Sequence, residues 1–295
     1  MRLFKFSFVL LVAMVTAGSL FGQSLVFDRG LPTANLNNAA GANRSNVAWA
    51  FDGDYITGDD FSFGTVGEKW LITKIRGWSI QGTPSGQELG DRFQSVTFYG
   101  GKLDASHLPL ASGNYTFGLT PLNPLLTGNL TPGASSNSNT SITHTRVQYA
   151  GGADYDSFGS PRQVWQHDFN LSWVVDGGTK YAFAGDGELR TGVSYYWFNH
   201  ASNAALSGSA QQGSDGLYFA WEKLSPNWLF VCDSGDALTC GGWDKSSDLN
   251  VQIWAKKIAT SSNSCKNNGW KTLFRADGSG FKNQGDCIQY VNTGR

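Results

Sequence analysis

Charge is scarce in this sequence and nearly balanced. Charged residues make up 15% of the 295 residues, with 22 Lys plus Arg against 23 Asp plus Glu and a formal net charge of −1. Such a chain has no basic field that would gather nucleic acid or anionic lipid. We therefore expect no nucleic acid among its partners.

Long apolar runs are absent after the N-terminus. Residues 1–23 read MRLFKFSFVLLVAMVTAGSLFGQ, with a basic start, then an apolar stretch and then small residues. This order predicts a secretory signal peptide, cleaved after Ala17, after Ser19 or near Gln23. No later segment approaches the ~18 uninterrupted apolar residues of a membrane span. We expect a mature chain that is secreted or at the cell surface and has no membrane span.

Cysteine is limited to four residues. In an oxidising compartment four cysteines indicate two disulfides, for which three pairings are open. Spacing favours the local pairs Cys232–Cys240 and Cys265–Cys287. A zinc site would need Cys-x-x-Cys pairs or accompanying histidines, and no histidine follows His200. We therefore expect disulfides in preference to a metal site or a redox centre.

The composition favours strands and turns over helices, with 37 Gly and 11 Trp. Residues 165–175 (WQHDFNLSWVV) alternate between apolar and polar side chains, and residues 249–257 (LNVQIWAKK) repeat the pattern. A period of two predicts strands with one buried face. We predict an all-β chain, an antiparallel β-sandwich of jelly-roll type with about ten strands. A closed barrel is the structural alternative.

Further segments complete the predicted organisation. Shorter strands are predicted at 46–51, 60–63, 71–80, 93–99, 142–149, 180–184, 194–198, 217–222 and 228–232. Residues 120–141 hold three prolines and many Ser, Asn, Thr and Gly, which predicts a long loop. The domains are then a signal peptide at 1–23, the sandwich at 24–258 and a small C-terminal module at 259–295.

The C-terminal module carries helix signals. Asn283 suits an N-cap, Asp286 falls in the first turn, where the helix dipole favours negative charge, and Gly294 can end the element. A helix over about 284–292 is predicted, and a disulfide would stabilise so small a unit.

Several motifs carry a family resemblance. VFDRGLPTANLNNAAG, YITGDDFSF before ITKIRGWSI, GGTKYAFAG and DLNVQIWA follow one another between residues 24 and 258. In this order they resemble bacterial exported β-sandwich proteins related to the Pro-Glu-Pro sorted class. The segments CKNNGW, FKNQGDC and IQYV after residue 264 resemble a cystine module at the ends of secreted bacterial proteins. The resemblance implies export and a sandwich, and it implies no established catalytic residue.

Signals for catalysis are weak. No G-x-S-x-G motif occurs, and His167 falls on the apolar side of its strand, as a core histidine would. Glycoside hydrolysis needs two carboxylates across a cleft, and no glutamate here has an informative setting. The favoured hypothesis is a non-catalytic protein, and the alternative is a secreted hydrolase acting on polysaccharide.

Aspartates on turns predict one candidate metal site. Asp52, Asp54, Asp59 and Asp60 supply hard oxygen ligands of the kind that calcium accepts. Asp-Gly pairs are also common in the turns of β-hairpins, so a turn without a metal ion is the alternative explanation for these aspartates. Calcium in a structural role is the one cofactor that the sequence suggests.

Tryptophans beside polar residues predict a sugar-binding site. Trp254 falls on the polar side of its strand, Trp78 shares a strand side with Lys74 and Arg76, and Trp243 follows the first cysteine pair. Exposed aromatic rings beside polar groups bind sugars by stacking and hydrogen bonding, whereas sandwich cores also need aromatic residues. We expect a protein for extracellular binding or surface or matrix interaction, with a glycan as the leading ligand.

Overall fold

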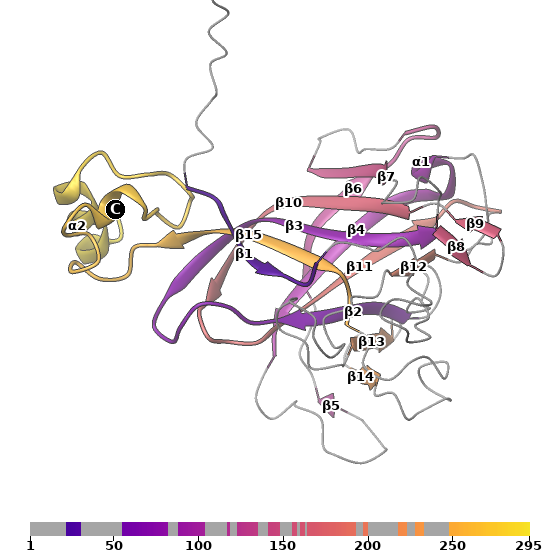
Figure 1. Cartoon of the computed structure of the whole chain (residues 1–295), viewed down its shortest axis with the longest axis horizontal. Coiled ribbons are helices and arrows are strands. Elements are labelled where there is room, and N and C mark those ends of the chain that lie inside the picture. The colour runs from indigo at the N-terminus through magenta and orange to yellow at the C-terminus, as the bar shows by residue number, and fades with distance from the viewer. Residues whose placement is uncertain are drawn as a thin grey trace, which may run out of the picture.

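Two antiparallel β-sheets pack face to face in this chain (Figure 1). The computed structural model describes residues 22–30, 55–81, 88–103, 117–118, 123–134, 141–147, 155–157, 160–162, 164–192, 197–199, 218–222, 228–232 and 248–295. The predicted signal peptide up to residue 21 and the predicted strand at 46–51 lie outside these residues.

The first sheet is built around the two longest strands. Its order in space is β1 (Ser24–Asp28), β15 (Val251–Ile258), β3 (Lys69–Gln81), β10 (Val164–Asp176) and β7 (Ile142–Val147). The short strand β12 (Trp197–Asn199) pairs with the end of β3. β1 at the start of the chain thus lies beside β15 near its end.

The second sheet contains the remaining long strands. Its order is β5 (Phe117–Gly118), β14 (Trp228–Cys232), β13 (Tyr218–Glu222), β2 (Tyr55–Phe61), β11 (Tyr181–Leu189), β4 (Phe93–Lys102) and β6 (Asn123–Asn129). A separate hairpin pairs β8 (Tyr155–Ser157) with β9 (Ser160–Arg162). The antiparallel sandwich is therefore confirmed.

The core lies between the inner faces of the two sheets. On β10 the apolar positions from Trp165 to Val175 face this core, as the alternation predicts. Aromatic contacts join the sheets: the ring centroids of Phe98 and Phe169 are 4.7 Å apart, and Phe61 meets Trp173 edge to face at 5.5 Å. Burial of such large rings is the main favourable term in the folding of a sandwich.

The prediction of a loop over 120–141 is wrong in part, because strand β6 lies within it. Among the described strands β6 pairs only with β4, which places it at the edge of the sheet. The register shifts between Phe98 and Tyr99, opposite Pro124. Proline is tolerated at edges and bulges, where a missing N–H breaks no ladder. The strand was not predicted because the segment is rich in residues that are typical of turns.

The helix and the disulfide predicted for the C-terminal module are both present in the structure. Helix α2 (Gln284–Thr293) has Asn283 as its N-cap, whose side chain accepts a hydrogen bond from the Asp286 N–H at 2.9 Å. Gly294 ends the helix at a φ of 74°, a conformation that favours glycine. The two Cα atoms of the Cys265–Cys287 disulfide are 5.8 Å apart, and both residues are buried.

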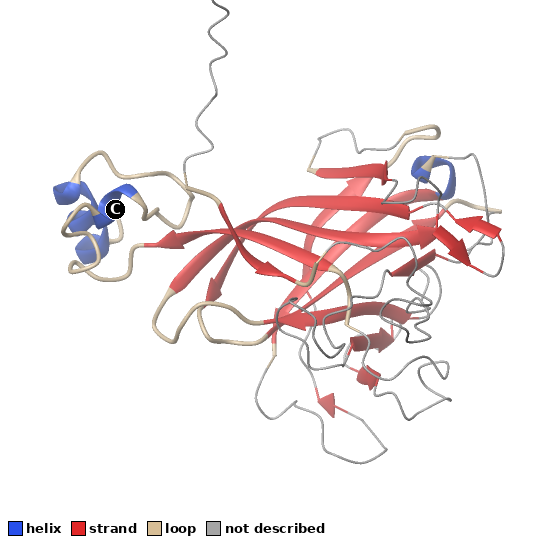
Figure 2. Cartoon of the chain, viewed as in Figure 1, coloured by secondary structure: helices blue, strands red, loops and turns tan. Residues whose placement is uncertain are grey.

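The module continues directly from the first sheet. Phe274 donates its N–H to the Lys257 carbonyl at 2.9 Å and accepts from the Ala259 N–H at 3.0 Å. Figure 2 shows the described helices at opposite ends of the sandwich, with the module at one end and α1 (Leu89–Arg92) at the other. The 3-10 turn Gly269–Lys271 belongs to the module. Cys232 lies on β14, but Cys240 lies outside the described residues, so that disulfide stays a prediction.

Candidate functional site

A row of polar side chains crosses the outer face of the first sheet. The register aligns Asp28, Gln252, Arg76, Asp168 and Thr143 on five neighbouring strands. Arg76 donates from Nε and Nη2 to the two carboxylate oxygens of Asp168 at 2.6 and 2.7 Å. The Gln252 amide donates to Asp28 at 3.2 Å. The row is therefore held in place by its own members.

Trp254 lies in the next row, on the same side of the sheet. Its neighbour on β3 is Lys74, whose Nζ is 3.6 Å from the indole ring centroid, and Cζ of Arg76 is 5.2 Å from it. Its neighbour on β1 is Leu25, which is 44% exposed. We call the row of five residues, together with Lys74 and Trp254, the outer polar face.

Partial burial changes the pKa of Lys74. Partial desolvation lowers the pKa of this ammonium, while Asp168 opposes the shift and Arg76 adds to it. Arg76 and Asp168 neutralise each other, because both oxygens of the carboxylate accept from the guanidinium. Lys74 is thus the cation of the outer polar face that has no ion-pair partner among the described residues.

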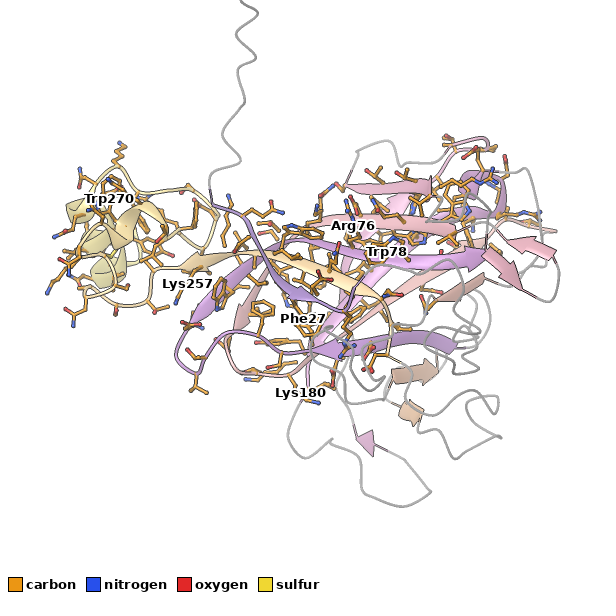
Figure 3. The ribbon with its side chains drawn as sticks, in the orientation of Figure 1. Phe27, Arg76, Trp78, Lys180, Lys257 and Trp270 are labelled. Atoms are coloured by element: carbon orange, nitrogen blue, oxygen red, sulfur yellow. A yellow bond between two sulfur atoms is a disulfide. The ribbon has the colours of Figure 1, made fainter. Side chains whose placement is uncertain are left out.

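The three predicted tryptophans have different positions. Trp254 is half-buried on the outer polar face. Trp78 lies on β3 opposite Gln166 of β10 (Figure 3). Its side chain is only 2% exposed. Its Nε1 has no hydrogen-bond partner in the described part of the chain. Trp243 lies outside the described residues.

Two of the four aspartates predicted to bind calcium, Asp59 and Asp60, lie beside a buried arginine together with Asp248. Nη1 of Arg29 is 2.5 Å from Asp59, and Nη2 is 3.3 Å from Asp60 and 3.5 Å from Asp248. Lys180 adds a second cation, 2.9 Å from Asp60. The positive charge that these carboxylates need comes here from side chains of the chain itself.

Burial dominates the electrostatics of this cluster. It raises the pKa of Asp59 well above its usual range, with the nearby Asp248 and Asp60 adding to the effect and Arg29 opposing it. Within the described ranges no group of His, Cys, Asp or Glu is arranged to hold a metal ion. Asp52 and Asp54 lie outside those ranges, so calcium stays a prediction.

A hydrogen-bonded chain of Ser79, His167 and His144 lies in the core, and sequence reasoning missed it. Ser79 Oγ contacts His167 Nε2, and Nδ1 of His167 is 2.6 Å from Nδ1 of His144. Each residue is at most 3% exposed. The prediction that His167 is a core histidine is confirmed. The one signal for its partner was that His144 and Ile142 both fall on the inner side of a predicted strand.

The environment of this chain opposes acid–base catalysis. Burial lowers the pKa of His167 to about 3 and that of His144 well below its usual value. A general base works best with a pKa near the working pH and must reach the substrate. A buried, neutral histidine beside a serine that is 0% exposed is suited to holding strands together.

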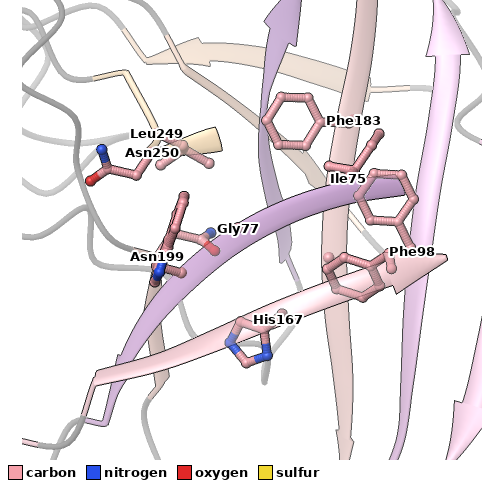
Figure 4. Close-up of a pocket in the computed structure, with 11 residues that line it drawn as sticks. Ile75, Gly77, Phe98, His167, Phe183, Asn199, Leu249 and Asn250 are labelled. Carbon is pink, nitrogen blue, oxygen red and sulfur yellow. The ribbon is translucent and has the colours of Figure 1, made fainter. Parts of the chain in front are cut away.

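A small cavity opens beside these residues, where β12 and β15 both meet β3 (Figure 4). Its volume is about 30 Å³, and Gly77, His167, Asn199 and Asn250 are among its lining residues. A water molecule needs about 10–15 Å³, whereas ligand pockets usually measure about 300–1,000 Å³. The cavity has room for water but not for a sugar ring.

Comparisons with known proteins return no relative. No protein-family model, no curated protein and no solved structure matches the chain. None of the helices in the described ranges is long and apolar enough to cross a membrane.

Proposed function

We propose that the chain is an exported, non-catalytic binding protein that attaches to polysaccharide through the outer polar face. The observation that carries this proposal is the half-buried indole of Trp254 beside a polar row that spans five strands. Export is supported by the signal-peptide pattern of residues 1–23 and by the Cys265–Cys287 disulfide.

The chemistry of this face suits a sugar polymer. A sugar ring has an apolar side that packs against an aromatic ring and an edge of hydroxyl groups that need hydrogen-bond partners. Trp254 supplies the aromatic ring, Asp28 supplies a carboxylate and Thr143 a hydroxyl group. The largely buried Gln252 holds Asp28 in place through its amide. An extended face of this kind fits a chain of sugars better than a single small molecule.

The alternative is a secreted hydrolase, and one contact favours it. Ser79 and His167 are hydrogen-bonded, as a nucleophile and its base would be. Against this alternative, both groups are buried and the adjoining cavity is about 30 Å³. A serine-directed fluorophosphonate probe tests this contact, because a serine hydrolase would be labelled at Ser79 and a binding protein would not.

A glycan array tests the proposal. Trp254→Ala should abolish binding to those polysaccharides that the unaltered protein retains, because it removes the stacking ring. Trp270→Ala, which removes a half-buried tryptophan of the C-terminal module, should leave binding unchanged. Absence of binding to every polysaccharide, or equal binding by the Trp254 variant, contradicts the proposal.

A further inference from the structure

The Lys74 ammonium lies where a stacked sugar would pack against Trp254. Its Nζ is 3.6 Å from the indole ring centroid, which is within the range of a cation–π contact. A neutral sugar that stacked on this side of the ring would have to displace the ammonium and would gain no ion pair. A ligand with a negative charge would gain an ion pair with the same ammonium.

No acidic side chain of the described residues forms an ion pair with this ammonium. The nearest carboxylate on the outer polar face is that of Asp168, and both of its oxygens bind Arg76. Asp28 is held at the far end of the row, where it accepts from the Gly30 N–H at 2.7 Å and from Gln252. A partly desolvated cation with no ion-pair partner attracts an external anion strongly, because water screens it less than a fully exposed one.

A second lysine follows Trp254 on β15. Lys256 is two residues further along β15, and its Nζ donates to the Gly278 carbonyl at 2.9 Å. It is also 4.8 Å from the Phe274 ring centroid. The Lys256 ammonium, like that of Lys74, therefore lies beside an aromatic ring.

We propose that the polysaccharide bound at the outer polar face is acidic, and that one of its carboxylate or sulfate groups pairs with Lys74 beside the Trp254 ring. This inference rests on the proposed function and specifies its ligand class. Neutral polysaccharides should bind weakly, because they must displace the ammonium without compensation.

Binding to three polymers tests this inference: polygalacturonate, which carries carboxylates, dextran sulfate, and neutral dextran. Lys74→Gln should weaken binding to the acidic polymers by about tenfold, as expected for the loss of one charge-assisted contact. Lys74→Arg should retain most of the affinity. Lys266→Gln, at an exposed lysine of the C-terminal module, is the matched control and should bind like the unaltered protein.

Salt gives an independent readout. At about 1 M salt the Debye length is about 3 Å, so charge–charge attraction is largely screened. The ratio of affinities for acidic over neutral polymers should then fall in the unaltered protein toward the ratio measured for Lys74→Gln. Thermal unfolding of each variant checks that it is folded. A difference between polygalacturonate and dextran sulfate then tells which anionic group the face prefers.

The outcomes separate the two proposals. If neutral dextran binds as tightly as the acidic polymers, or Lys74→Gln changes nothing, the acidic ligand is wrong. Should Trp254→Ala still abolish binding in that case, the outer polar face remains the polysaccharide site. If none of the three polymers binds and a glycan array is also negative, both proposals fail.

Discussion

Nη1 of Arg29 lies 2.5 Å from Oδ2 of Asp59, and this ion pair joins the two sheets of the sandwich. Arg29 directly follows β1 of the first sheet, while Asp59 lies on β2 of the second. Asp59 also accepts from the Leu249 N–H at 2.6 Å, just before β15 begins. Three distant parts of the chain therefore meet at one buried guanidinium.

Removing this guanidinium should strongly destabilise the folded protein. Arg29→Met leaves Asp59, Asp60 and Asp248 buried without their shared cation, and loss of one partner from a buried ion pair typically costs about 3–5 kcal/mol. Urea denaturation measures the loss. Lys69→Met is the control, because its exposed pair with Asp176 should contribute less than about 1 kcal/mol. Equal losses in the two variants would show that the Arg29 cluster is not a structural centre.

The histidine pair should make the protein sensitive to acid. The pKa of His167 is about 3 in the folded protein and about 6.5 when unfolded, and the pKa of His144 shifts in the same direction. Below pH 6.5 the unfolded chain therefore binds more protons than the folded protein. As the pH decreases, the free energy of unfolding decreases by up to about 1.4 kcal/mol per pH unit for each histidine. This contribution is fully present above pH 6.5.

The measurement is the free energy of unfolding between pH 6.5 and 4.5. His144→Gln combined with His167→Gln should flatten the dependence in this window, whatever the overall stability of the variant. The raised pKa of Asp59 acts in the opposite direction, so the slope of the variant relative to the unaltered protein is the quantity to compare. Parallel slopes would mean that the histidines are not buried and neutral.

The Cys265–Cys287 disulfide should stabilise the C-terminal module locally. It closes a separation of 22 residues, for which the chain-entropy model gives about 3 kcal/mol. Replacing both cysteines by serine should speed amide exchange in α2 and leave exchange in β10 unchanged. Faster exchange throughout the sandwich would show that the module and the sandwich unfold as one unit.

Substitution by alanine should have opposite effects on stability at two glycines, one in each sheet. A Cβ at Gly58 would lie 1.8 Å from the Phe183 carbonyl oxygen, so Gly58→Ala should destabilise the second sheet by about 1–3 kcal/mol or more. At Gly77 the nearest atom is the Asn250 carbonyl oxygen at 4.0 Å, and the cavity lies beside it. Gly77→Ala should be neutral or stabilising by up to about 1 kcal/mol. Thermal melts of both variants test the contrast.

The long strands could be predicted from the sequence because one face of each is buried. Alternation over 165–175 corresponds to β10, whose apolar positions lie in the core. β6 was missed because an edge strand needs no continuous apolar face and tolerates Pro124. The C-terminal helix was predicted closely, since its cap residues act on their own neighbours in the sequence.

The candidate site was predicted only in part. That Trp254 lies on the polar side of its strand follows from alternation, but its contact with Lys74 depends on how β15 and β3 pair. The same holds for His144 and His167, which come together through the register of β7 and β10. Side-chain pairs that form across strands depend on register, and local sequence patterns do not contain it.

The most direct test of the outer polar face is the indole N–H signal of Trp254 in a two-dimensional NMR spectrum. This signal is assigned by its loss in Trp254→Phe, and polygalacturonate is then titrated into the labelled protein. The Trp254 signal should shift or broaden with added polymer while the signal of Trp270 stays in place. A Trp254 signal that does not change while the polymer binds elsewhere would contradict the proposed site.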